Sequence, residues 1–356
     1  MRSVVYFVRS APGESPEELA GKALRLYEAA GFDSLISEGA FVALKQHFGE
    51  GKGIGYLKPP IARAFAERVK SRGGKPFLTE TATLYRGARS NAVDHINLAY
   101  EHGFTPEAVG CPVVMADGLV GASQRNVTID RKHYKEVPIA EALFHTHAVI
   151  VLTHVTGHPG TGLGASIKNL GMGLSSRAGK MNQHHGAVPL VDAEKCTACG
   201  TCAQWCPVGA ITVEKSAAID ETRCIGCGEC LAVCPTGAVG FKWGESSRNV
   251  QEKMAEHALG ITKVLRGRTA CFNFATYVTH GCDCFGTKQD PVIDDVGILA
   301  STDPVAVDLA TGELLRKEVG EDVFKREYPD IDWTVQVTYG GEIGLGSTEY
   351  ELVEVK

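Results

Sequence analysis

The sequence reads Cys196-Thr-Ala-Cys-Gly-Thr-Cys-Ala-Gln-Trp-Cys-Pro-Val-Gly-Ala210, and 28 residues later it reads Cys224-Ile-Gly-Cys-Gly-Glu-Cys-Leu-Ala-Val-Cys-Pro-Thr-Gly-Ala238. Eight of the fifteen positions match, including all four cysteines, the proline and the final Gly-Ala pair. The two runs hold eight of the twelve cysteines in the chain. The repeat predicts one small module with internal two-fold symmetry, which we place at residues 191–241.

The spacing within each run is typical of iron–sulfur ligation. Both runs follow the pattern Cys-x2-Cys-x2-Cys-x3-Cys-Pro, and in two-cluster ferredoxins the fourth cysteine of each run ligates the other cluster. The predicted ligand sets are Cys196, Cys199, Cys202 and Cys234 for one [4Fe–4S] cluster, and Cys224, Cys227, Cys230 and Cys206 for the second. Two zinc sites are the alternative, but zinc ribbons use paired Cys-x2-Cys knuckles rather than triple-cysteine runs. The segment resembles a bacterial ferredoxin domain with two [4Fe–4S] clusters, and such a module either relays electrons or only helps the chain to fold.

The remaining composition is that of a globular protein. Hydrophobic residues make up 44% and charged residues 22% of the 356, and the net charge of −6 argues against nucleic acid as a partner. The longest aliphatic run, 148–152, is far shorter than the ~20 residues that span a bilayer. We read no secretion signal at the N-terminus and expect a cytoplasmic protein without a membrane partner, where clustered cysteines bind metal more often than they form disulfides.

Outside the repeat, strand patterns alternate with helix patterns. Strands are expected near residues 4–8, 41–48, 75–81, 112–117 and 148–155, and helices begin after Ser15 and Asp303, each followed by a proline that suits the first helical turn. This alternation predicts an α/β fold with a mostly parallel sheet flanked by helices, in two parts, 1–190 and 242–356, interrupted by the small α+β module. Residues 334–338 and 350–355 are predicted as late strands with antiparallel pairing.

Polar side chains follow several of the predicted strands. Lys45 and His47 come at the end of one strand, Glu80 ends another, and His154 ends the run that begins at Ala148. Because ligands bind outside the carboxyl ends of the strands in open α/β sheets, we expect a shared polar cleft there. His154 and His158 could share a metal, but Gly157 and Pro159 argue against the helix that this spacing requires.

A glycine-rich stretch, 160–173, follows the same strand and contains Lys168. It fits neither the P-loop nor the dinucleotide-binding pattern. Lys168, Lys180, His184 and His185 make the region basic, so its partner is an anionic substrate or the nearby clusters; otherwise it is a simple connection into the module. The predicted substrate-binding or proton-transferring residues are Lys45, His47, His154 and Lys168.

Three further cysteines lie after the repeat. Cys271, Cys282 and Cys284, with His280, offer four soft ligands for a third metal centre. The alternatives are buried free thiols or a labile Cys-x-Cys dithiol.

Several stretches resemble the family catalogued as domain of unknown function 362, in its ferredoxin-fused form. They include Lys168-Asn-Leu-Gly-Met-Gly, Cys282-Asp-Cys284 and Asp303-Pro-Val-Ala-Val-Asp308. The resemblance implies an α/β domain with an inserted ferredoxin module, and it implies no particular reaction.

The leading functional hypothesis is an iron–sulfur oxidoreductase that acts on a small anionic substrate and receives electrons from a redox partner protein or a small donor. The alternatives are a non-catalytic electron carrier and a metal- or redox-sensing scaffold.

Overall fold

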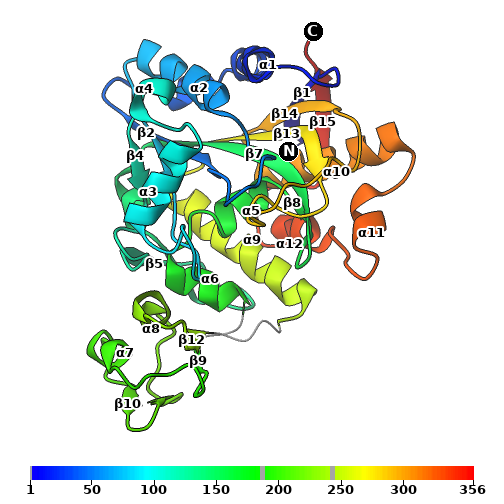
Figure 1. The fold of residues 1–356 in the computed structure, drawn as a ribbon. Helices are drawn as coiled ribbons and strands as arrows, with labels where there is room; N and C mark the ends of the chain where they lie inside the picture. Colours follow the sequence, from blue (N-terminus) through cyan, green and yellow to red (C-terminus); the bar gives the residue numbers. More distant parts are fainter. Residues whose placement is uncertain (1, 185–188, 241–244) are drawn as a thin grey trace.

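The computed structural model describes residues 2–184, 189–240 and 245–356 (Figure 1). Within these residues, nine strands from both sides of the cysteine repeat form one central sheet. In spatial order they are β15 (Tyr350–Glu354), β1 (Ser3–Arg9), β14 (Gly297–Ser301), β13 (Thr269–Thr279), β7 (Ala148–His158), β2 (Phe41–Gln46), β3 (Lys75–Glu80) and β4 (Val113–Met115), with β8 (Gly162–Gly164) paired to β7.

The sheet is mostly parallel, as the alternation of strands and helices predicts. The five strands from β4 to β13 pair in parallel, whereas β14 is antiparallel to both of its neighbours and β8 is antiparallel to β7. In this register Lys45 of β2 lies between Thr79 of β3 and Val151 of β7. Lys45 therefore lies on a central strand of the sheet, with a paired strand on each side, and not on an edge strand.

Helices cover both faces of the sheet, because successive residues of its central strands point to opposite sides. Val149 and Val151 pack into one core, and Ile150 and Leu152 pack into the other. The first core is closed by α5 (Ser166–Gly171), α9 (Ser247–Val264), α10 (Pro304–Val319) and α12 (Val335–Glu342), with α6 (Arg177–His184) and α11 (Val323–Glu327) beside them. The second is closed by α1 (Pro16–Ala29), η1 (Phe32–Leu35) and α2 (Pro59–Ser71), with α3 (Ala92–Glu101) and α4 (Pro106–Val109). The remaining elements are the hairpin of β5 (Gln124–Thr128) and β6 (Glu136–Ala140), and η2 (Glu141–His145).

Two local expectations are confirmed and two are wrong. Ser15 forms a capping box with Glu18 at the start of α1, and Asp303 caps α10. The strand predicted at 334–338 is instead the start of α12, because this segment packs along α9, where the Tyr339 hydroxyl donates to Glu256 at 2.6 Å. The last predicted strand exists as β15, but it pairs in parallel with β1 rather than antiparallel.

The cysteine repeat forms a small unit with its own core. Its elements are β9 (Leu190–Val191), α7 (Thr201–Gln204), β10 (Ile211–Val213), β11 (Ala217–Ile219), α8 (Glu229–Val233) and β12 (Val239–Gly240). Each cysteine run leads into a short helix and then a strand, and β9 pairs with β12 as β10 pairs with β11. The unit lies beyond α6, with α8 nearer than α7 to the rest of the protein (Figure 1). Phe241, at the predicted boundary, and His185 lie outside the described residues.

Candidate functional site

A cavity of about 750 Å³ opens at the carboxyl ends of β2, β3 and β7. All four residues predicted to bind or protonate a substrate, Lys45, His47, His154 and Lys168, line it. Lys45, His47 and His154 meet because the parallel strands β2 and β7 end at the same edge of the sheet, and Lys168 joins them from α5, the helix that follows β7 and β8. Residues of α6 and of the loops after β3 and β13 complete the wall.

Lys45 is neutralised within the protein. Its side chain is 1% exposed, its ammonium forms an ion pair with Glu80, and it donates to Asn169 Oδ1 at 2.6 Å. Burial lowers the pKa of Lys45, and the Glu80 carboxylate opposes that effect. Since its charge is already matched, Lys45 is better placed to orient Asn169 and Glu80 than to bind a free anion.

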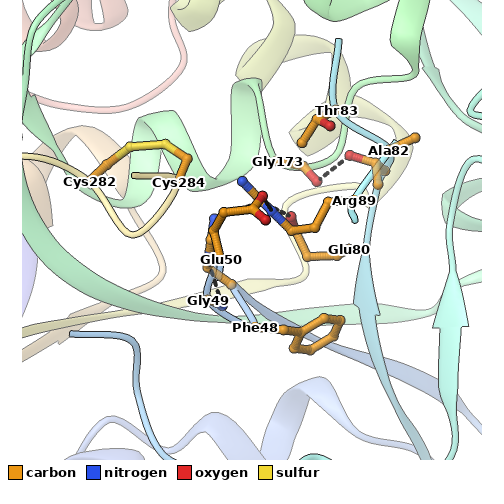
Figure 2. Close-up of polar contacts among 12 residues, drawn as sticks. Phe48, Gly49, Glu50, Glu80, Ala82, Thr83, Arg89, Gly173, Cys282 and Cys284 are labelled. Carbon is orange, nitrogen blue, oxygen red and sulfur yellow. Dashed lines mark hydrogen bonds and ion pairs between the residues drawn. A yellow bond between two sulfur atoms is a disulfide. The ribbon is translucent and has the colours of Figure 1, made fainter. Parts of the chain in front are cut away.

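Arg89 ties the loop after β3 to the loop after β2. Its Nε donates to Glu50 Oε2 at 2.8 Å, and its Nη1 lies 3.8 Å from Glu80 Oε2 and 2.7 Å from His47 Nε2. Figure 2 shows the guanidinium with the carboxylates of Glu50 and Glu80. Burial, reinforced by the charge of Arg89, holds the pKa of His47 well below its usual value, so this ring is neutral.

Lys168 and Lys180 both face the cavity without forming an ion pair among the described residues, but only Lys180 has hydrogen-bond acceptors, the Thr81 hydroxyl and the Ser175 carbonyl. Lys168 lies on α5, whose first two amides, those of Ser166 and Ile167, donate to the buried carboxylate of Asp308 at 2.8 and 2.7 Å. No hydrogen bond or ion pair joins the Lys168 ammonium to another side chain or carbonyl in the part of the chain that the structure describes. Burial lowers the pKa of Lys168 to about 8. The ammonium is therefore available to an anion, or as a proton donor near neutral pH.

His154 forms a buried pair with Asp283. Its Nδ1 lies 3.0 Å from both carboxylate oxygens of Asp283, and its Nε2 lies 2.9 Å from the carbonyl oxygen of Tyr277. Because both ring nitrogens face acceptors, the ring must donate twice, which only the imidazolium does. Although burial opposes it, the Asp283 carboxylate raises the pKa of His154.

The structure does not bring together the four residues expected to form a third metal centre. Cys282 and Cys284 form a disulfide on the cavity wall (Figure 2). Cys271 is a residue of β13 and is fully buried in the core, whereas His280 lies on the surface, 2.8 Å from Glu327. Among the described residues, the eight cysteines of the repeat included, no group of three or more His, Cys, Asp or Glu is arranged to hold a single metal ion.

Helix α6 joins the cavity to the cysteine unit. Lys180 and His184 line the cavity, and one turn earlier the fully buried Arg177 lies against Gly228, where an added Cβ would approach its side chain to 3.1 Å. Gly228 has a φ of 72°, in the left-handed region that favours glycine, and it precedes α8. The second cysteine run thus contacts the helix that carries cavity residues.

The cysteine unit contains two small hollows. One is lined by Cys196, Cys199, Cys202 and Cys234, and the other by Cys206, Cys224, Cys227 and Cys230. In each hollow, three cysteines come from one run and the fourth comes from the other run. The cysteines are thus grouped across the two runs, and the ligation of two clusters by these sets stays a prediction.

Sequence reasoning left several cavity residues out of the predicted site. Asn169 stands in the sequence only within a stretch that resembles the family, Glu80 is one of several polar residues that end predicted strands, and no pattern described above contains Arg89. Asp308, which does not line the cavity but caps α5 beside it, also stands only within a stretch that resembles the family. Asp308 is fully buried and caps α5, and a charged residue in the otherwise apolar Val305–Ala310 run was the available signal. The ion pair of Arg89 with Glu50 spans 39 residues and the hydrogen bond of Asn169 with Lys45 spans 124, so local patterns could not identify these two contacts.

Residues 42–313 match the family described as "Domain of unknown function (DUF362)", and the chain belongs to this family. A search of curated proteins found no match. Among solved structures, the chain is similar to a protein from Thermotoga maritima determined as a structural genomics target, with 10% identity, a TM-score of 0.42, and coverage of 90% of this chain and 60% of that one. It is also similar to the lactate racemase apoprotein from Thermoanaerobacterium thermosaccharolyticum, with 10% identity, a TM-score of 0.33, and coverage of 73% and 58%.

The chain thus spans about three fifths of the length of each of these two proteins. In the described ranges, no helix is long and apolar enough to cross a bilayer.

Proposed function

We propose that this protein is an iron–sulfur oxidoreductase in which the cysteine unit holds two [4Fe–4S] clusters and the cavity binds a small anionic substrate. The observation that carries the proposal is the crossed grouping of the eight cysteines around two hollows. Four thiolates around one space form the donor set of a cubane, which bears one thiolate on each of its four irons. When bound, such clusters store and transfer single electrons.

Polar hydrogens of the unit already point at the cysteine sulfurs. The amide of Ala210 donates to Cys206 Sγ at 3.2 Å, and the amide of Ala217 donates to Cys196 Sγ at 3.3 Å. Hydrogen bonds of this kind stabilise thiolate charge and raise the potential of a bound cluster. Cys199 is exposed, whereas Cys230 is buried and lies beside α6. Electrons would therefore enter through the set that contains Cys199 and leave through the set that contains Cys230.

The cavity favours an enzyme over a simple electron carrier. A carrier needs a docking surface, but here about 750 Å³ of space is lined by buried charged groups held in fixed positions. The Lys168 ammonium, which has neither an ion pair nor a hydrogen-bond acceptor in the described residues, would bind a carboxylate or another anion. The Lys45–Glu80–Arg89 network holds the surrounding loops in place. The sensing scaffold, in turn, has no need of a preformed cavity.

The test is elemental analysis of protein purified without oxygen. Two cubanes give about eight irons and eight sulfides per chain, since each contains four of both. Cys111→Ser is the matched control, because Cys111 is a buried thiol outside the cysteine unit, and its iron content should be unchanged. Zinc in place of iron, or less than about one iron per chain, would overturn the cluster assignment.

A further inference from the structure

We propose that Cys282 and Cys284 are a redox-active pair, a disulfide that takes up two electrons at the cavity and returns them to a bound substrate. The proposal goes beyond the assignment of two clusters and rests on the proposed function only for the source of its electrons. Both cysteines line the cavity, together with Lys168 and His154. Cys282 is 4% exposed and Cys284 is half-buried, so the bond is reached from the cavity rather than from the outer surface.

The disulfide has little structural purpose. One residue separates the two cysteines, so the bond closes a very short loop and removes little conformational entropy from the unfolded chain. Disulfides that persist because they stabilise a fold usually close longer loops. A disulfide that stabilises little and faces a cavity is more consistent with a catalytic or redox-sensing role.

The loop that carries the pair is anchored without the disulfide. The amide of Gly281 donates to Gln289 Oε1 at 2.6 Å, and the amide of Lys52 donates to the carbonyl of Gly286 at 3.0 Å. Asp283, between the two cysteines, is held by His154. Because these contacts fix the loop on both sides, the S–S bond can break and re-form while the cavity wall stays in place.

Electrons, protons and bonds balance in the proposed reaction of the Cys282–Cys284 disulfide. Two electrons and two protons convert the disulfide into two thiols, with the S–S bond broken and one S–H bond formed on each sulfur. Each of the two proposed clusters supplies one electron. The two protons come from water that enters the cavity, with the Lys168 ammonium, an N–H acid on the cavity wall, as the group that passes them on. In the return step the S–S bond re-forms and the two electrons and two protons pass to the substrate, which is therefore a two-electron acceptor.

One tryptic peptide reports the state of the pair and contains its own control. Cleavage after Arg268 and Lys288 releases residues 269–288, which contain Cys271, Cys282 and Cys284 and no other cysteine. Native protein is equilibrated without oxygen in dithiothreitol buffers of increasing reduced-to-oxidised ratio, then unfolded and alkylated together. We expect one label per peptide, on Cys271, at oxidising ratios and three labels at reducing ratios, reversibly and with unchanged iron content.

Two results would overturn the proposal. One is a single label at every ratio in native protein, with three labels only when reduction follows unfolding, which defines an inert disulfide. The other is three labels at every ratio, which defines two free thiols. If the pair is reversibly reduced and oxidised in protein that contains no iron, this proposal is supported and the cluster assignment is refuted. Failure of this proposal and failure of the proposed function can therefore be distinguished.

The electron source has a separate readout. Reduced methyl viologen should convert the pair at least tenfold faster in wild-type protein than in Cys230→Ser, whereas dithiothreitol should convert both equally. Equal rates with methyl viologen would overturn the clusters as the source of electrons for the pair.

Discussion

The cysteine unit and the cavity are built in opposite ways. In the unit, eight cysteines within 39 residues surround two hollows, and each hollow takes three cysteines from one run and the fourth from the other. In the cavity, Lys45, Glu80, Lys168 and Asp283 come from four separate segments and are held by the sheet, the helix caps and one another. The first kind of site can be read from a short motif, and the second depends on the whole fold. Changes in the unit should therefore act on its metal content, and changes in the cavity should act on global stability.

The largest expected effect is in the cysteine unit. Cys230→Ser removes one thiolate from the buried set beside α6, and we expect the loss of about four of about eight irons per chain. Because binding of a structural metal group contributes directly to folding, the unit should also become sensitive to proteolysis. Iron analysis and limited proteolysis check this, with Cys111→Ser as the control. Full iron content in Cys230→Ser would show that this cysteine is no ligand.

The next effect is in the cavity. Glu80→Gln leaves the Lys45 ammonium buried without its carboxylate, and the stability should fall by about 3–5 kcal/mol. Glu67→Gln is the matched control, since Glu67 pairs with Arg63 on an exposed helix face and its loss should cost less than about 0.5 kcal/mol. Urea unfolding measures both variants. Similar losses in the two would mean that burial of the Lys45–Glu80 pair has no energetic consequence.

A smaller effect is expected at the cap of α5. Asp308→Asn replaces one acceptor oxygen by an amide nitrogen, which then opposes an N–H of Ser166 or Ile167. A buried donor without an acceptor costs about 1–3 kcal/mol. Asp220→Asn is the control: this carboxylate lies in an exposed turn of the cysteine unit, and its replacement should leave the unfolding transition almost unchanged. Thermal unfolding of both variants tests the difference, and an unchanged transition in Asp308→Asn would contradict the role of the cap.

The smallest expected effect is a gain in folding stability rather than a loss, and it concerns Lys168. The pKa of Lys168 falls from 10.5 when unfolded to about 8 when folded, so the buried cation destabilises the fold below pH 8, and this cost disappears as the pH rises towards 10.5. Lys168→Met should therefore raise stability at pH 7 by about 1–2 kcal/mol, since water in the cavity screens part of the shift, and should change it little near pH 10.5.

Lys180→Met provides the matched comparison for Lys168. Burial also lowers the pKa of Lys180 to about 8, but its ammonium donates to the Thr81 hydroxyl and the Ser175 carbonyl. Its removal leaves these acceptors without a donor, so the gain in stability should be smaller. Unfolding transitions at pH 7 and pH 10 measure both variants. A loss of stability at pH 7 in Lys168→Met would show that Lys168 has a structural partner.

How much of the protein could be predicted from its sequence also depends on whether a feature is local in the chain or depends on the whole fold. The mostly parallel sheet and the convergence of Lys45, His47, His154 and Lys168 could be predicted, because strand patterns and the rule for strand ends are properties of short segments. The capping of α5 by Asp308 could not, since it depends on two helices more than 130 residues apart. The helical state of residues 334–338 was also missed, because packing against α9 overrides the β-branched pattern of Val335 and Val337.

The pairing of β7 with β13 also has a consequence for the order in which the protein is made. Val149 lies opposite Thr269, so 120 residues must be added to the growing chain after β7 before its partner strand exists. At a synthesis rate of about 5–20 residues per second, the edge of β7 that pairs with β13 stays unpaired for roughly 6–24 seconds during synthesis. The whole cysteine unit emerges within that interval. Its small core can therefore form while the central sheet is still open.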